Sequence, residues 1–146
     1  MEYRVGSIGR VIVIRFTDGE DLLNGLTEVA KKEDIRSAVF QIVGGLKKGG
    51  FVVGPEEEKM PPKPVWRELR ESHEAFGFGT IFWDEEKPRI HFHGAYAKKD
   101  TVKSGCLRRD SEVFLILEVV IFELNGIDAR RIPDAETGLS LLGFVN

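Results

Sequence analysis

Residues 88–123 read PRIHFHGAYAKKDTVKSGCLRRDSEVFLILEVVIFE, and they predict three successive β-strands. The first runs from Arg89 to Ala97, and after the polar turn Lys98-Lys99-Asp100 the chain returns through Cys106. The last strand, from Glu112 to Leu124, is almost continuously apolar, as expected for a strand that is covered on both sides. We expect the rest of the chain to be arranged around this stretch.

Two histidines and the single cysteine of this stretch suggest a metal site. Side chains alternate along a strand, so His91 and His93 share one face with Cα atoms roughly 6.5–7 Å apart, and Cys106 falls on the returning strand. Imidazole and thiolate are ligands that zinc prefers, and three protein ligands leave an open position for water, substrate or another chain. The alternative is that the two imidazoles are simply hydrogen-bonded core or surface residues.

Three further charged residues are candidates for chemistry at the same place. Glu118 lies inside an apolar strand, where a carboxylate needs a partner. That partner is either a salt bridge or subunit contact, or the metal site, where Glu118 would act as outer acceptor or general base. Arg108 or Arg109 could hold an anionic substrate through paired hydrogen bonds, although both could equally be solvated. His73 is expected to be structural.

Upstream of this stretch, the sequence predicts one helix among short strands. Leu22, Leu26, Val29 and Ala30 recur at helical spacing within residues 21–33. Strands are predicted at residues 10–16, 37–43, 51–53, 66–69 and 73–83. The Gly44-Gly45 and Gly49-Gly50 pairs around Lys47-Lys48 are typical either of a phosphate-binding loop or of a glycine bulge between strands.

Within residues 73–83, large and small side chains occupy opposite faces. Phe76 and Phe78 alternate with Gly77 and Gly79. The bare glycine face predicts that something packs closely over it, and the backbone of another subunit is one candidate.

Length and composition favour one soluble domain. The 146 residues are 42% hydrophobic and 31% charged, which predicts a single domain over residues 1–146, with a core at about 10–125 and a partly ordered extension at 126–146. The net charge of -3 does not match nucleic acid or an anionic membrane. The one basic stretch, from Lys98 to Arg109, is either a solvated hairpin or a local patch for DNA.

The sequence also indicates a location in the cytoplasm. No apolar segment has the length of a signal peptide or of a membrane span, and a single cysteine agrees with a reducing compartment.

Seven motifs, in their order along the chain, resemble the PPC domain, the conserved domain shared by plants and prokaryotes. They are Gly19 to Leu23, Gly44-Gly45-Leu46, Phe76 to Ile81, Pro88 to His93, Ser104-Gly105-Cys106-Leu107 and Leu117 to Ile121, together with the helix that follows the first of them. The resemblance covers about Val11 to Leu124. It implies an α/β (α+β) fold, in which one main helix packs on a mixed, largely antiparallel sheet, and assembly as a homotrimer.

The resemblance also implies a metal centre. Family members with metal use the two strand histidines and a third histidine from a Gly-Gly-His-Leu motif, which correspond to His91, His93 and Cys106. Here cysteine replaces the third histidine and Ser104 the first glycine. Acetolactate decarboxylases have a similar zinc site on a His-x-His strand.

Three hypotheses follow for function. The first is a trimeric protein that holds a divalent metal, most simply zinc, and whose activity is unassigned. The second is association with DNA without the AT-hook segments of the plant members, which this chain lacks. The third is a metal-dependent lyase or hydrolase that acts on a small anionic metabolite, with Glu118 and Arg108 as catalytic candidates.

Overall fold

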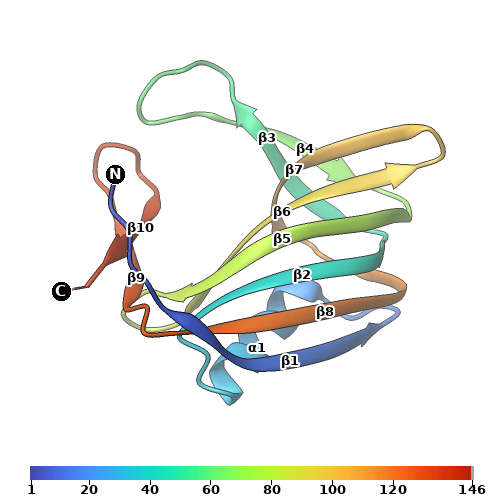
Figure 1. The fold of residues 1–146 in the computed structure, drawn as a ribbon. Helices are drawn as coiled ribbons and strands as arrows, with labels where there is room; N and C mark the ends of the chain where they lie inside the picture. The colour runs from blue at the N-terminus through green and yellow to red at the C-terminus, as the bar shows by residue number, and fades with distance from the viewer. Residues whose placement is uncertain (146) are drawn as a thin grey trace.

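The computed structural model describes residues 1–145, which form one main antiparallel sheet, one helix and a small C-terminal hairpin (Figure 1). The elements are β1 (Ser7–Thr17), α1 (Leu22–Lys32), β2 (Ser37–Leu46), β3 (Gly49–Pro55), β4 (Pro64–Leu69), β5 (His73–Trp83), β6 (Pro88–Lys98), β7 (Thr101–Arg109), β8 (Val113–Asn125), β9 (Ala129–Pro133) and β10 (Ser140–Phe144). Each predicted strand and the predicted helix are present within a few residues of the expected bounds. The extension, expected to be only partly ordered, forms the β9–β10 hairpin.

The main sheet has the strand order β1-β8-β2-β5-β6-β7-β3-β4, and every pair in it is antiparallel. The predicted α+β class with a largely antiparallel sheet is confirmed. The main sheet is not mixed, however, because it contains no parallel pair of strands among residues 1–145. A parallel pair needs a crossover connection, and the one helical crossover here joins β1 to β2. Because β8 lies between these two strands, they never pair.

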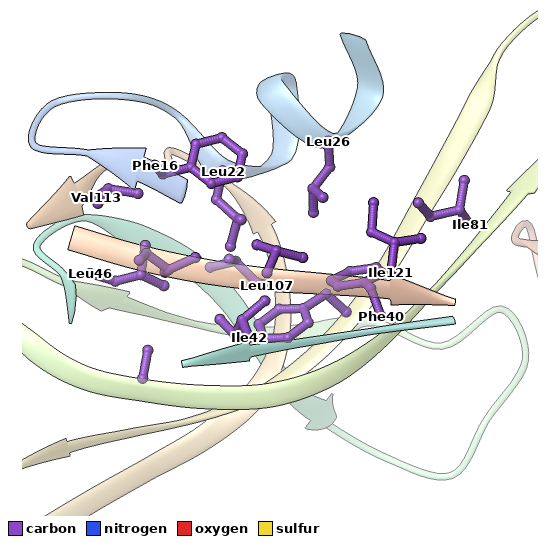
Figure 2. Packing of buried hydrophobic residues seen from close by; sticks show 14 of the residues in the cluster. Phe16, Leu22, Leu26, Phe40, Ile42, Leu46, Ile81, Leu107, Val113 and Ile121 are labelled. Carbon is purple, nitrogen blue, oxygen red and sulfur yellow. The ribbon is translucent and has the colours of Figure 1, made fainter. Parts of the chain in front are cut away.

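Helix α1 lies against one face of the sheet and covers the main core. Leu22, Leu26 and Ala30 are fully buried at helical spacing. Figure 2 shows that Leu22 and Leu26 pack toward sheet residues such as Phe40 and Ile121, and Ala30 belongs to the same core cluster. Burial of each leucine contributes about 1.5–3 kcal/mol. Among residues 1–145, no helix has the length and apolar character that a bilayer crossing requires.

The start of α1 is tied to the residues that precede β8, the last strand of the stretch at residues 88–123. The Asp21 carboxylate accepts from the backbone N–H of Asn24 at 2.9 Å, which caps the helix. It also accepts from the backbone N–H of Ser111 at 3.0 Å and from the Ser111 hydroxyl at 2.9 Å, while Leu23 N–H donates to the Ser111 oxygen at 2.9 Å. Ser111 is fully buried, so this network fixes the helix against the residues that precede β8.

The glycines of β5 are covered by the chain's own aromatic rings. A Cβ atom at Gly77 would lie 2.6 Å from the Phe92 ring, and one at Gly79 would lie 2.2 Å from the Phe40 ring. The two rings stack with centroids 5.7 Å apart. The expectation of close packing over these glycines is confirmed, but the packing group is the core of the same chain rather than another subunit.

The opposite face of the sheet is open. The register places Cys106, His93, Phe78, Gln41, Val120 and Val13 in one row across six strands. Phe78 is 50% exposed and Val13 is 72% exposed. The prediction that the apolar strand at residues 112–124 is covered on both sides is therefore wrong for a single chain, because α1 covers only one face of β8.

Candidate metal centre

His91 and His93 project from β6 onto the open face, because Phe92 between them points into the core. Their Nε2 atoms lie 3.0 Å apart, and the two rings meet edge to face with centroids 4.9 Å apart. Two nitrogens that share a tetrahedral zinc ion at 2.0–2.1 Å would be separated by roughly 3.3 Å. The spacing therefore suits a shared ion, and it also suits a hydrogen bond between two neutral rings.

Cys106 joins the pair from the neighbouring strand. It lies directly opposite His93 in the β6–β7 register, and its side chain is buried. The ligand atoms of His91, His93 and Cys106 all lie within 4.8 Å of one another. The structure thus brings together the three residues that the sequence selected as metal ligands.

The protonation of two cluster members is set by burial and by nearby cations. Burial, and then the positive charge of Arg131, lower the pKa of His91 to about 4, so this ring is neutral near pH 7 and able to bind a metal. Burial raises the pKa of the Cys106 thiol, although the adjacent Arg108 acts in the opposite direction. Because metal binding needs the thiolate, binding at Cys106 would release a proton.

Arg131 of β9 reaches the cluster from the C-terminal hairpin. Its guanidinium donates to the Thr80 hydroxyl at 2.9 Å, and it approaches Nδ1 of His91 at 3.4 Å. A metal-bound histidine usually donates its second ring N–H to a carboxylate or carbonyl. Here that position faces a cation instead, so the surroundings of His91 are unusually positive.

A pocket of about 610 Å³ lies beside the cluster. It occupies the space where β7 separates from β6, since the last β6–β7 pair is Phe92 with Leu107 and His91 lies beyond it. The lining residues include His91 with Lys87, Arg89, Arg108 and Arg131, and apolar side chains from α1, β6 and the C-terminal segment. Among the described lining residues, none is acidic.

The other predicted catalytic residues are placed differently. Arg108 lies in this pocket, whereas Arg109 stacks over Trp66 and faces Glu68. Glu118 is exposed on the open face of β8, and β2 and β5 separate that strand from β6. Three strand spacings are about 14 Å, so one chain does not bring Glu118 to the histidines.

Two glycine-flanked lysines and the third histidine have structural partners. Lys47 pairs with Asp18 and Glu112, and Lys48 pairs with Glu112. The sheet register shifts between Gly44 and Gly45, as predicted for a glycine bulge. His73 is buried with Nδ1 2.7 Å from the carbonyl oxygen of Glu71, in agreement with a structural role.

Sequence reasoning missed Arg131 and Thr80. Thr80 lies on the same face of its strand as Phe78, but nothing in the sequence marks it as part of the site. Arg131 lies in the extension, where no periodic pattern marks a contact with β6. The only available signal was a pair of adjacent arginines, Arg130 and Arg131, after the last predicted strand.

Comparison with known proteins finds similarity over nearly the whole chain. Residues 3–125 match the model of the Plants and Prokaryotes Conserved (PCC) domain. A metal-containing protein of Archaeoglobus fulgidus has a similar structure, with a TM-score of 0.84, 25% identity and 100% of each chain covered. No curated protein sequence matches this chain significantly.

Two other solved structures are also similar. A plant- and prokaryote-conserved (PPC) protein of Pyrococcus horikoshii has a TM-score of 0.85 and 28% identity, over 100% of this chain and 99% of the other. A protein of Ralstonia eutropha, for which DNA binding is conjectured, has a TM-score of 0.76 and 23% identity, over 91% and 90% of the two chains. The last similarity shows the shared fold alone.

Proposed function

Because this chain belongs to the Plants and Prokaryotes Conserved (PCC) domain family, we propose that it is a metal-binding protein whose ion is held by His91, His93 and Cys106. The observation that carries this proposal is the convergence of two imidazoles and one thiol, from adjacent strands in register, within 4.8 Å. The metal-containing relative from Archaeoglobus fulgidus supports it.

The donor set favours zinc among divalent ions. Two neutral imidazoles and one thiolate suit a borderline-soft cation better than magnesium or calcium, which prefer oxygen. When bound, such an ion would supply Lewis-acid chemistry at the position that the three protein ligands leave open. Around that position, the chain contributes a half-buried neutral histidine and the guanidinium groups of Arg108 and Arg131.

Metal analysis of protein purified without an affinity tag tests this proposal. We expect about one zinc per chain, and loss of that zinc in His93→Ala and Cys106→Ala. His73→Gln is the matched control, because it removes an imidazole five residues along β5 from Phe78, about 17 Å from the row that contains His93. Absence of stoichiometric metal in the parent protein, with unchanged metal in both ligand variants, would exclude the site.

We also propose that the protein is a cytoplasmic homotrimer. The open face presents large apolar side chains, among them Phe76 at 62% and Phe78 at 50% exposure. Exposed apolar patches of this kind are typical of interfaces between proteins. Sedimentation equilibrium would test the assembly, with a mass close to three times the 16.4 kDa chain expected and a monomer at all concentrations contradicting it.

Association with DNA is the second candidate function. It rests on the basic stretch from Lys98 to Arg109 and on the conjecture attached to the Ralstonia eutropha relative. Within that stretch Lys98 pairs with Glu71, which reduces the charge available to a phosphate. Binding to duplex DNA should weaken as salt rises, and lack of retention at low salt would exclude it.

A further inference from the structure

The pocket beside the histidines has the charge pattern of an anion site. Arg108 enters it from β7 and Arg131 from β9, so two elements far apart in sequence direct guanidinium groups to one place. The titratable groups that act on Arg131 are Arg108 and the Cys106 thiol, and within residues 1–145 no carboxylate is among them. Two like charges therefore converge without an acidic partner from the described chain.

The position of Arg131 is fixed by the fold. Its guanidinium donates to Thr80, and its strand pairs with β10, where Arg131 lies opposite Leu142. Guanidinium groups recognise carboxylate and phosphate oxygens through paired hydrogen bonds, and a group held in place in this way loses little entropy on binding. Partial burial strengthens such contacts relative to those on an open surface.

The rest of the pocket is apolar enough to accept a short hydrocarbon group. Leu23 of α1, Ile90 of β6 and Leu139 of the hairpin loop lie around it. His91 also lines it, so a ligand held by the arginines lies next to the cluster. Of the other cationic lining residues, Arg89 already pairs with Asp84, and Lys87 offers a single ammonium rather than a planar guanidinium, so Arg108 and Arg131 are the main anchors for paired hydrogen bonds.

We propose that Arg108 and Arg131 form a binding site for a small organic oxyanion, a carboxylate or phosphate with a short apolar group, beside the His91–His93–Cys106 cluster. This proposal extends the metal site but does not depend on it, because Arg131 is positioned by Thr80 and by the pairing of β9 with β10 rather than by a bound ion. The ligand's anionic end would contact the two guanidinium groups, and its apolar end would contact Leu23, Ile90 and Leu139.

Titration of the full chain with butyrate and with inorganic phosphate, followed by chemical-shift changes, tests the site. We expect butyrate to shift signals of Arg131 and His91 in protein with and without metal. Arg131→Gln and Arg108→Gln should each weaken butyrate binding about tenfold or more, since each removes a charge-assisted hydrogen-bond pair. Arg131→Lys keeps the positive charge but not the planar guanidinium, so it should lose less butyrate affinity than Arg131→Gln.

Two neighbouring arginines provide matched controls. Arg109 faces Trp66 and Glu68, and Arg130 lines a different hollow near Trp83, so Arg109→Gln and Arg130→Gln should change butyrate affinity less than about twofold. Equal losses in all four variants would show a general surface-charge effect and overturn the proposal. So would unchanged binding in Arg131→Gln and Arg108→Gln, provided that thermal unfolding confirms that these variants fold.

The outcomes separate this proposal from the metal site. Butyrate binding to a protein that never binds metal would exclude the metal function and support the oxyanion site. Stoichiometric metal in a protein that binds neither butyrate nor phosphate would support the metal function and exclude the oxyanion site. A preference for phosphate over butyrate would identify the ligand as a phosphate, and a preference for butyrate would identify a carboxylate.

Discussion

Both faces of the main sheet carry large apolar side chains, but the two faces differ in what covers them. On one face, Phe40 and Phe92 are fully buried beneath α1 and stack on each other. On the other face, Phe76 is 62% exposed and Phe78 is 50% exposed, and Phe78 lies opposite His93 in the β5–β6 register. The covered face stabilises the fold, whereas the open face holds the candidate metal ligands. Strand alternation alone separates them, because successive residues point to opposite faces.

The largest expected effect compares one phenylalanine from each face. Phe40→Ala should reduce the free energy of unfolding by about 3–5 kcal/mol, because it leaves a cavity in the core. Phe78→Ala should cost less than about 1 kcal/mol in dilute protein, because half of the ring is already in water. Chemical denaturation of both variants provides the measurement.

Protein concentration sharpens this comparison. If other copies cover the open face, the cost of Phe78→Ala should grow as concentration rises, while that of Phe40→Ala stays the same. If Phe40→Ala and Phe78→Ala lowered the free energy of unfolding equally at every protein concentration, the two faces would not differ in this way.

The second prediction concerns the buried polar link beneath α1. Ser111→Ala should cost about 1–3 kcal/mol, since it removes hydrogen bonds with Asp21 and Leu23 at a site without access to water. Ser104→Ala, on the exposed part of β7, is the control and should change stability by less than about 0.5 kcal/mol. Similar melting temperatures for both variants would contradict the prediction.

The third prediction is a pH dependence on the open face of the metal-free protein. The pKa of His91 is about 4 in the folded chain, against 6.5 for a free histidine, so the unfolded chain binds the proton first. Stability should therefore be complete above pH 6.5 and fall as the pH decreases toward 4. The loss should be about 1 kcal/mol, after allowance for the partial exposure of the ring.

Denaturation curves between pH 7 and 4 would measure this loss. His91→Gln should flatten that part of the pH profile, because glutamine does not titrate. An unchanged slope in His91→Gln would assign the effect to other groups.

The smallest effect is expected at Glu118. Glu118→Gln should leave metal affinity within about twofold if one chain completes the site, because three strand spacings separate β8 from β6. Competition with a chelator would measure this affinity. A loss of more than about tenfold would instead indicate that another copy brings its Glu118 to the cluster.

Much of the fold follows from local pattern. The spacing of Leu22, Leu26 and Ala30 predicted α1, and the alternation through Phe76 and Phe78 predicted β5 with its correct faces. The predictions that failed depended on contacts between residues far apart in the sequence. A run of apolar residues in β8 cannot indicate whether a second layer belongs to the same chain, and one carboxylate cannot indicate how many strands separate it from a histidine.

The candidate site divides in the same way. His91 and His93 could be paired from spacing, and Cys106 from the hairpin that follows, because these contacts lie within one supersecondary unit. Arg131 could not be found, since its approach to His91 depends on how the C-terminal hairpin folds back over β5 and β6. Its strand, β9, lies close to β5, and no local rule reports that contact.

Arg131 lies in the C-terminal segment beyond the conserved domain, and this position affects how relatives of this protein could diverge. The three proposed metal ligands lie within the conserved domain at residues 3–125, whereas Arg131 and Leu139 lie beyond it. Substitution or exchange of that short segment would alter five of the fifteen lining residues without changing the strand that carries the histidines. With the proposed oxyanion site, ligand choice would change through the tail while the domain stays constant, so two relatives with the same His-His-Cys cluster need not bind the same ligand.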